Sequence, residues 1–343
     1  MTDSQTRQLA MVFDLNKCIG CQTCAVACKM LWTRDESTDY QWWCTVNTVP
    51  GRGSPKDWEK MGGGYQDGKL VLGTAPDKEN FGGGWDFNYN EVFYGESEQR
   101  VPLRVTGEQP TWGPNWDEDQ GGGEYPNSYY YYLPRLCNHC THPACVEACP
   151  SGAMSKRPQD GIVVRDEQTC QGKRACAKAC PYKKIYFNQQ RQVSQHCMMC
   201  LPRIEDGVAP ACARQCPGRL VFVGYLDDDR GPIHKLVKEW QVALPLHPEY
   251  GTQPNVYYIP PIGPKPINED GSIDEERNRI PDELLEEQFG TDVHQALATL
   301  KAEMAKTREG GQSDLMDLLI VYKWQELFGE FTVDPVTITH QKE

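Results

Sequence analysis

Alternating apolar residues near the start of the chain predict a strand over residues 8–15, QLAMVFDL. A cysteine-rich loop follows, and then a short helix is expected over 25–31. Similar patterns predict strands at 160–166, 183–188 and 220–228, each leading towards or away from another group of cysteines. The repeated order of strand, cysteine loop and helix indicates an internal repeat.

Residues 32–130 show little helical period and are interrupted by glycine triplets at 62–64, 82–84 and 121–123. A disordered linker would hold few aromatic residues, whereas this stretch has seven tryptophans. We therefore expect an irregular insertion, laid over the core and against a partner subunit. The tryptophans are Trp32, Trp42, Trp43, Trp58, Trp85, Trp112 and Trp116.

The last part of the chain, from residue 231, begins with a proline-rich stretch at 243–264 that we expect to be a packed extended arm. A polyproline ligand at 260–261 is the alternative. Two amphipathic helices should follow. The apolar face of the first holds Val293, Leu297, Leu300 and Met304, and the second starts at Ser313 and presents Leu315, Leu318, Leu319 and Tyr322.

Fifteen of the 16 cysteines fall into four tight groups. Spacings of two, two and three residues let three thiolates cap one face of a cubane iron–sulfur cluster, while the fourth thiolate points to a neighbouring cluster. Three of the groups end in Cys-Pro, as such runs usually do. The groups are Cys18, Cys21, Cys24 and Cys28; Cys137, Cys140, Cys145 and Cys149; Cys170, Cys176 and Cys180; and Cys197, Cys200, Cys212 and Cys216.

Disulfides and structural zinc are the alternative uses of so many cysteines. A disulfide framework would scatter its cysteines along a short chain, and zinc ribbons do not use runs of four cysteines with this spacing. Iron–sulfur clusters are therefore the preferred interpretation.

Because the last cysteine of each group serves another group's cluster, the four groups must form two exchanging pairs. In the nested hypothesis the first group pairs with the fourth and the second with the third; exchange between adjacent groups is the alternative. Nesting gives four sets: Cys18, Cys21, Cys24 and Cys216; Cys28, Cys197, Cys200 and Cys212; Cys137, Cys140, Cys145 and Cys180; and Cys149, Cys170 and Cys176.

The third group departs from the pattern, because Lys173 occupies the position of its middle thiolate in CQGKRACAKACP. Lysine is a poor ligand near neutral pH, so three thiolates suit a 3Fe–4S cluster. Lys173 and Arg174 are candidate cofactor contacts. Nearby Lys178, Lys183 and Lys184 would stabilise the reduced cluster, unless they form a solvated basic face.

Several residues outside the ligand sets have predicted supporting roles. Cys44, the sixteenth cysteine, should be a buried free thiol, and the tyrosines at 129–132 should pack in the core. Met198 and Met199 should shield the second cluster from water. The histidines are expected to be hydrogen-bond partners that tune the cluster potentials rather than iron ligands; they are His139, His142 and His196.

Charge and hydropathy limit the partners. Lys+Arg 35 against Asp+Glu 48 gives a formal charge of −13, which disfavours nucleic acid. The N-terminal residues contain no twin arginine or signal-like apolar stretch, and no apolar run of about 18 residues exists to span a membrane. We expect a periplasmic protein exported with a signal-bearing partner; a cytoplasmic protein peripheral to the membrane is the alternative.

Four runs resemble one family, the iron–sulfur (beta) subunits of the DMSO reductase superfamily of molybdenum enzymes: LNKCIGCQTCAVACK, YYLPRLCNHCTHPACVEACPSGAM, DGIVVRDEQTCQGKRACAKACPYKKIYFN and WQVALPLHPEYGTQPNVYYIPP. The branch includes nitrate, selenate and chlorate reductases, dimethylsulfide dehydrogenase and ethylbenzene dehydrogenase. The resemblance implies nested pairing and three 4Fe–4S clusters plus one 3Fe–4S cluster. It also implies a large subunit with molybdenum bis-pterin guanine dinucleotide and a small subunit with haem b. The run WWCTVNTVPGRGSPKDWEKMGGGY looks most like the ethylbenzene dehydrogenase type.

These expectations combine into an α+β protein of two nested ferredoxin-like modules. The first comprises residues 1–31 and 190–230 and the second 131–189, with the insertion at 32–130 and an arm plus helices at 231–343. Its expected role is an electron-transfer subunit without catalysis of its own, in an ethylbenzene dehydrogenase-like complex or, with reversed flow, in a nitrate, selenate or (per)chlorate reductase. An enzyme binding substrate at an open iron, and a zinc scaffold, are the competing hypotheses.

Overall fold

The structure is a computed structural model that describes residues 7–83, 87–95, 100–107, 113 and 121–339. Strand β1 (Leu9–Asp14) is buried along its whole length and lies inside a four-stranded sheet of order β10-β1-β12-β11. It pairs antiparallel with β10 (Val221–Tyr225) and parallel with β12 (Val256–Ile259), which in turn pairs with β11 (Leu244–Pro245). The predicted strands at 8–15 and 220–228 are thus neighbours, although some 200 residues separate them.

In the part of the chain that the structure describes, four two-stranded ribbons accompany this sheet, and all four are antiparallel. The predicted strands at 160–166 and 183–188 appear in two of them. The ribbons are β2 (Thr45–Val49) with β5 (Tyr131–Arg135), β3 (Tyr65–Gln66) with β4 (Lys69–Leu70), β6 (Met154–Lys156) with β7 (Val163–Arg165), and β8 (Ile185–Asn188) with β9 (Val193–His196).

The short helices that carry cysteines pack in two pairs. Helix α1 (Thr23–Trp32) contacts α6 (Ala211–Arg214), and α3 (Ala144–Glu147) contacts α4 (Ala175–Ala179). The first cysteine group therefore lies beside the fourth, and the second beside the third. Helix α5 (Leu201–Glu205) follows Cys200.

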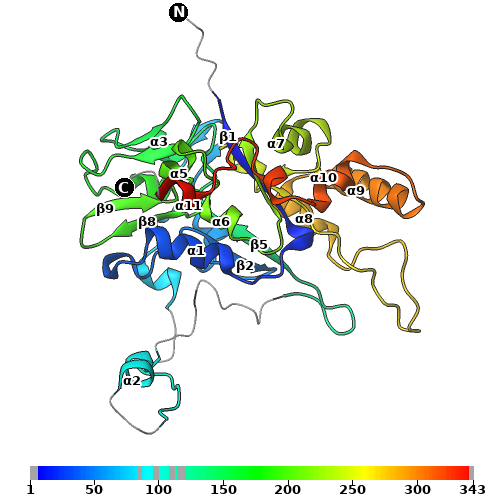
Figure 1. Cartoon of the computed structure of the whole chain (residues 1–343), viewed down its shortest axis with the longest axis horizontal. Coiled ribbons are helices and arrows are strands. Elements are labelled where there is room, and N and C mark those ends of the chain that lie inside the picture. The colour runs from blue at the N-terminus through cyan, green and yellow to red at the C-terminus, as the bar shows by residue number, and fades with distance from the viewer. Residues whose placement is uncertain (1–6, 84–86, 96–99, 108–112, 114–120, 340–343) are drawn as a thin grey trace, which may run out of the picture.

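The 32–130 stretch is less irregular than predicted, because β2 pairs with β5 directly before the second cysteine group. Trp43 and Trp58 are buried in the core, and Trp32 and Trp42 are half-buried; Trp85, Trp112 and Trp116 lie outside the described residues. The short helix α2 (Tyr89–Tyr94) belongs to a small lobe that stands apart from the body (Figure 1). Of the tyrosines at 129–132, Tyr131 is buried and Tyr130 is exposed.

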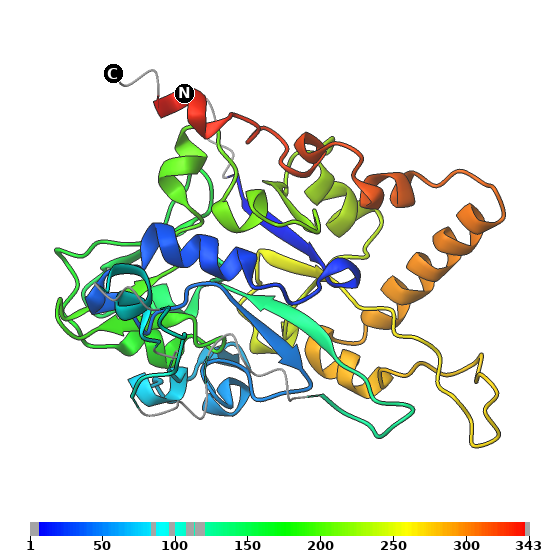
Figure 2. The ribbon, with the colours of Figure 1, turned by 60° about the horizontal axis from the view of Figure 1, so that its bottom comes forward.

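The C-terminal region begins with α7 (Pro232–His234), and the proline-rich stretch then contributes β11 and β12 to the central sheet, as a packed arm would. Helices α8 (Asp282–Phe289), α9 (Val293–Arg308) and α10 (Asp314–Ile320) follow, with α11 (Pro335–Thr339) last. Figures 1 and 2 show α9 and α10 at the opposite end of the body from the β8–β9 ribbon.

Most of the predicted helical faces are buried, but Tyr322 is 74 % exposed, so its assignment to the apolar face was wrong. Helix α10 ends at Ile320 and Val321 is left-handed with φ 53°, which turns Tyr322 away from the helix face.

The chain contains both helices and strands, and its strand pairs are mainly antiparallel, which fits the α+β class. The predicted module boundary between residues 189 and 190 lies in the turn of the β8–β9 ribbon, so one ribbon joins the two predicted modules. Within the described residues, no helix has the length and apolar character needed to cross a bilayer.

Shortening Phe13 to alanine should destabilise the protein, because Phe13 is fully buried in β1 and stacks on Tyr258 with ring centroids 5.8 Å apart. We expect Phe13→Ala to lower the free energy of unfolding by about 3–5 kcal/mol, measured by denaturant unfolding followed by intrinsic fluorescence. Phe93→Ala is the matched control, since Phe93 is 68 % exposed. Equal effects of the two changes would contradict the central position of β1.

Candidate metal-cluster sites

The first thiol set is assembled by the pairing of β1 with β10. Cys18 follows β1 and Cys216 precedes β10, and Phe13 pairs with Val221, so the antiparallel register brings both cysteines to one edge of the sheet. Burial and the charges of the other members together raise the pKa of the Cys18 thiol to about 12. The first set lines one cavity and comprises Cys18, Cys21, Cys24 and Cys216.

The second thiol set lines a cavity between α1 and the loop after β9. Burial, followed by the charges of its neighbours, raises the pKa of Cys212 well above its usual range. The indole N–H of Trp32 donates a hydrogen bond to the Sγ of Cys200 at 3.2 Å. The second set comprises Cys28, Cys197, Cys200 and Cys212. Met198 and Met199 line the same cavity, as expected of residues that keep water away.

The third thiol set lies where α3 and α4 meet. Burial raises the pKa of Cys140 to about 12 and that of Cys145 well above its usual range, and the charge of Cys180 acts in the same direction on both. The third set lines its own cavity and comprises Cys137, Cys140, Cys145 and Cys180.

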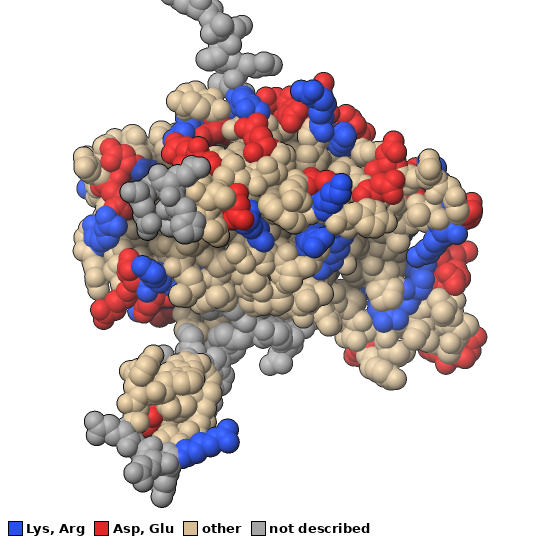
Figure 3. Space-filling view, in the orientation of Figure 1, with Lys and Arg blue, Asp and Glu red and all other residues tan. Residues whose placement is uncertain are grey.

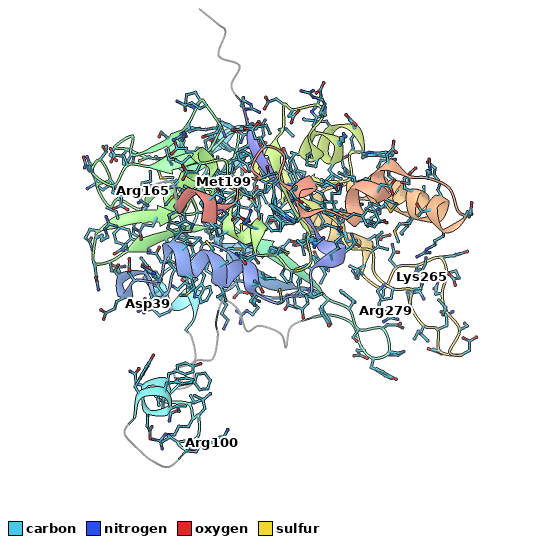
Figure 4. The ribbon with its side chains drawn as sticks, viewed as in Figure 1. Asp39, Arg100, Arg165, Met199, Lys265 and Arg279 are labelled. Atoms are coloured by element: carbon cyan, nitrogen blue, oxygen red, sulfur yellow. The ribbon has the colours of Figure 1, made fainter. Side chains whose placement is uncertain are left out.

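The fourth thiol set comprises Cys149, Cys170 and Cys176. Burial raises the pKa of Cys176, and the charges of Cys149 and Cys170 act in the same direction, while the 3.3 Å hydrogen bond between its Sγ and the Ser194 hydroxyl opposes them. Arg165 is close enough for Cys170 and Cys176 to raise its pKa, against the dominant effect of burial. In Figure 4 Arg165 lies towards one end of the body, and Met199, beside the second set, lies near the middle.

The four sets follow one another as neighbours. The charge of Cys24 from the first set acts on Cys212 of the second. The second and third sets meet at Cys197 and Cys137. The third and fourth sets meet at Cys145 and Cys176.

The donors fit iron–sulfur clusters. Thiolates are soft ligands that favour iron–sulfur clusters and zinc, and they bind metal only when deprotonated. Buried thiols that raise one another's pKa need nearby positive charge to ionise, which the irons of a cluster supply. Among the described residues, no three His, Cys, Asp or Glu side chains are placed to hold a single metal ion.

The loops of the first and third cysteine groups have the same backbone shape. Gly20 and Gly172 both have φ 67°, and the residues before the helices, Gln22 and Arg174, have φ 59° and 58°. A side chain at Gly20 would lie 2.6 Å from Tyr132, so glycine is needed there for space as well as for φ. Lys173 therefore stands in the third loop where Cys21 stands in the first.

The left-handed turn recurs in the other two groups without glycine. His139 has φ 44° and Met199 has φ 54°, each at the position that corresponds to Gly20. Non-glycine residues seldom adopt this conformation, so its recurrence marks a loop shape that all four cysteine groups share.

The predicted cofactor contacts Lys173 and Arg174 have different surroundings. Lys173 is exposed beside the fourth set, and Arg174 donates to the carbonyl of Pro76 at 2.9 Å and to the carboxylate of Asp77 at 3.2 Å. Arg174 therefore ties the cysteine loop to the 32–130 stretch.

The basic residues near the third group do not form one solvated face. Lys178 is exposed, but Lys183 and Lys184 are almost completely buried, so that alternative is wrong for these two. Lys184 lines the cavity of the third thiol set rather than lying beside the fourth.

The histidines make hydrogen bonds to the backbone. His139 Nδ1 accepts from the N–H of Val163 at 3.0 Å, and His196 Nδ1 lies 2.7 Å from the carbonyl oxygen of Cys197. His142 is exposed and stacks on Tyr65 with ring centroids 4.0 Å apart. These contacts orient the cysteine loops.

Cys44 and Trp32 contact ligand sulfurs, which the sequence did not predict. Cys44 is buried, as predicted, but its hydrogen bond to Cys24 lowers the pKa of that thiol. Trp32 was assigned to the insertion, although it lies one helical turn after Cys28 and so on the same face of α1, which is a signal that the sequence contains.

Comparisons with known proteins agree with this chemistry. Residues 128–226 match a family described as the 4Fe-4S dicluster domain. The chain is 55 % identical over 328 residues to the selenate reductase subunit beta of Thauera selenatis, covering 94 % of this chain and 99 % of that protein. It is 55 % identical over 329 residues to the chlorate reductase subunit beta of Ideonella dechloratans, with coverages of 94 % and 99 %. The dimethylsulfide dehydrogenase subunit beta of Rhodovulum sulfidophilum is 51 % identical over 323 residues, with coverages of 94 % and 98 %.

Replacing Trp32 by phenylalanine should lower the reduction potential of the centre held by the second set. A hydrogen bond to a ligand sulfur stabilises the more negative, reduced state, and Trp32→Phe removes that donor from Cys200. Redox titration followed by electron paramagnetic resonance (EPR) measures the shift. Trp43→Phe is the control, because Trp43 lines the same cavity but its N–H donates to Gln41; a potential that moves only in the control would contradict the assignment.

Proposed function

This chain belongs to the family of iron–sulfur beta subunits of the selenate, chlorate and nitrate reductases, and we propose that it relays electrons through four clusters between a molybdenum catalytic subunit and a haem b subunit. Such beta subunits transfer electrons and do not catalyse the reaction themselves. The succession of four neighbouring thiol sets is the observation that carries the proposal. Bound clusters would supply one-electron carriers, and the chain would hold them in order and away from water.

The nested ligand assignment is supported by three contacts between elements. Strand β1 pairs with β10, α1 packs on α6, and α3 packs on α4. Each contact joins the first cysteine group to the fourth or the second to the third. In this proposal the first, second and third thiol sets each hold a 4Fe–4S cluster.

The fourth thiol set holds a 3Fe–4S cluster in this proposal. The loop around Lys173 repeats the backbone of the loop around Cys21, so the missing thiolate is a change of side chain in an unchanged loop. A strongly hydrated ammonium group suits solvent at this position better than it suits iron.

Electrons enter and leave at the first and fourth sets, because these are the two ends of the succession. Close to the first set, exposed apolar residues offer a surface for a partner subunit: Ile19 is 70 % exposed, and Val26 and Met30 of α1 are 48 % and 58 % exposed. Elsewhere positive and negative side chains are interspersed over the face shown in Figure 3.

The substrate would be bound on another chain, so this chain identifies the complex only by resemblance. Because part of the insertion looks most like the ethylbenzene dehydrogenase type, an ethylbenzene dehydrogenase-like complex is the first candidate. A selenate, chlorate or nitrate reductase, with the opposite electron flow, is the second candidate, favoured by the names of the relatives. Assaying the purified complex with ethylbenzene and with each oxyanion distinguishes them. We place the complex in the periplasm, exported with a signal-bearing partner, and cell fractionation tests this against a cytoplasmic location.

Replacing Lys173 by cysteine should convert the 3Fe–4S centre into a 4Fe–4S centre with a lower potential, because the fourth thiolate returns to its place in the loop. Low-temperature EPR of the oxidised, anaerobically purified complex should then lack the 3Fe–4S signal. Lys178→Cys adds a thiol at an exposed position of the same motif and should leave the signal intact. A 3Fe–4S signal that persists in Lys173→Cys would refute the assignment of the fourth set.

A reciprocal pair of changes should separate nested from adjacent pairing. With nested pairing, Cys149→Ser should abolish the 3Fe–4S signal, whereas Cys216→Ser should disturb only a 4Fe–4S centre. With adjacent pairing, Cys216 would serve the third group's cluster, so the two outcomes would be exchanged. EPR and iron analysis of both variants measure the difference.

A further inference from the structure

Lys184 is a buried cation whose hydrogen-bond partners are all neutral. Its side chain is 1 % exposed, and its Nζ donates to the carbonyl of Trp42, the hydroxyl of Thr45 and the hydroxyl of Tyr186, each at 3.2 Å. These three acceptors satisfy the three N–H groups of an ammonium. No carboxylate forms an ion pair with Lys184 among the described residues.

A buried charge is costly unless an opposite charge lies near it. Burial and the positive charge of Arg135 lower the pKa of Lys184 to about 7, and only thiol groups act in the opposite direction. They are Cys44, Cys28 and Cys197. The hydrogen bond between Cys44 and Cys24, together with burial, raises the pKa of Cys44 well above its usual range, so Cys44 stays a neutral thiol.

The anions that face Lys184 therefore belong to two thiol sets. Cys28 and Cys197 are members of the second set. The Trp42 carbonyl and Thr45 hydroxyl that accept from Lys184 flank Trp43 and Cys44, which line the cavity of that set. Lys184 also lines the cavity of the third set, together with Cys137 and Cys180. The ammonium is held between the two sites by the three acceptors of β2, β8 and the residues just before β2.

We propose that Lys184 is the shared counter-charge of the second and third clusters and raises the reduction potentials of both. This inference rests on the proposed function, since it requires clusters in both sets. Reduction adds negative charge to a cluster, and a fixed cation nearby stabilises the reduced state more than the oxidised state.

Lys156 provides an internal comparison, because its charge faces the third set alone. Its Nζ donates to Gln8 at 2.7 Å, to the carbonyl of Gly161 at 2.6 Å and to that of His139 at 3.1 Å. Burial lowers the pKa of Lys156, and the thiols that raise it, Cys140, Cys137 and Cys145, are all members of the third set.

Redox titration of the whole, anaerobically purified complex, followed by EPR, tests the proposal. In Lys184→Met, two of the four midpoint potentials should fall, with a decrease of about tenfold in each one-electron reduction constant, or ~59 mV. In Lys156→Met, one of those same two midpoints should fall and the other should stay. The remaining two centres serve as internal references.

Two further variants separate charge from packing. Thr45→Val removes one hydrogen-bond acceptor but keeps the ammonium, and Lys184→Arg keeps the charge; neither should reproduce the fall seen in Lys184→Met. If Lys184→Met does not assemble with full iron content, Lys184→Gln provides the neutral variant.

The outcomes distinguish the two proposals. Four centres with midpoints unchanged in Lys184→Met or Lys184→Gln would overturn the role of Lys184 and leave the electron relay standing. Unmodified complex without iron–sulfur signals would overturn the relay itself. A counter-charge shared by the second and third sets would also be overturned if Lys184→Met lowered the midpoint potentials of all four centres. The same holds if Lys184→Met and Lys156→Met each lowered the midpoint potential of one centre only, and it was the same centre in both.

Discussion

The hydrogen bonding of β1 to β10 on one side and to β12 on the other determines where the first two thiol sets can form. Phe13 opposite Val221 brings Cys18 and Cys216 to one edge of the sheet, and α1 can then lie against α6. That contact places Cys28 with the cysteines that follow β9, so the first two sets depend on one strand pairing. The middle groups form their own helix contact between α3 and α4 and are joined to the rest through Cys137 and Cys197. A burial-driven sheet thus organises the polar chemistry, because β1 is buried along its whole length and is paired with a strand on each side.

Much of this arrangement could be predicted from the sequence, because the cysteine spacing and the alternation of apolar residues report local geometry. The strands at 8–15 and 220–228, helix α9 and a cysteine site for each group are of this kind. Long-range strand pairing could not be predicted in this way. Nothing in residues 45–49 alone specifies that they pair with 131–135, so β2 was predicted to be part of an irregular insertion. The burial of individual charged side chains could not be predicted for the same reason, because it also depends on long-range packing. In KKIYFN the two lysines look like the polar start of a surface strand, and only the packing of β2 and of Trp42 encloses Lys184.

The recurrence of one backbone turn in all four cysteine groups explains how a ligand can be lost without loss of the loop. The left-handed residue lies at Gly20 and Gly172 in two groups and at His139 and Met199 in the others. Glycine adopts this conformation without cost, whereas a larger residue must be held in it by its surroundings. His139 is held by hydrogen bonds on both its ring and its carbonyl oxygen. Because the turn and not the thiolate shapes the loop, a lysine at position 173 leaves the neighbouring ligands in place.

Charge is distributed in opposite senses inside and outside the protein. The chain as a whole carries a formal charge of −13, and yet the largest fully buried side chains include Arg135, Lys183 and Lys184. Arg135 stacks 3.5 Å above Trp58 and is influenced by the carboxylate of Glu59, whereas Lys184 meets only neutral oxygens and thiols. Clusters held by thiolates add negative charge to the interior, and each added electron increases it. Fixed cations beside the second and third sets offset that increase without moving, so the protein need not reorganise its interior each time an electron passes.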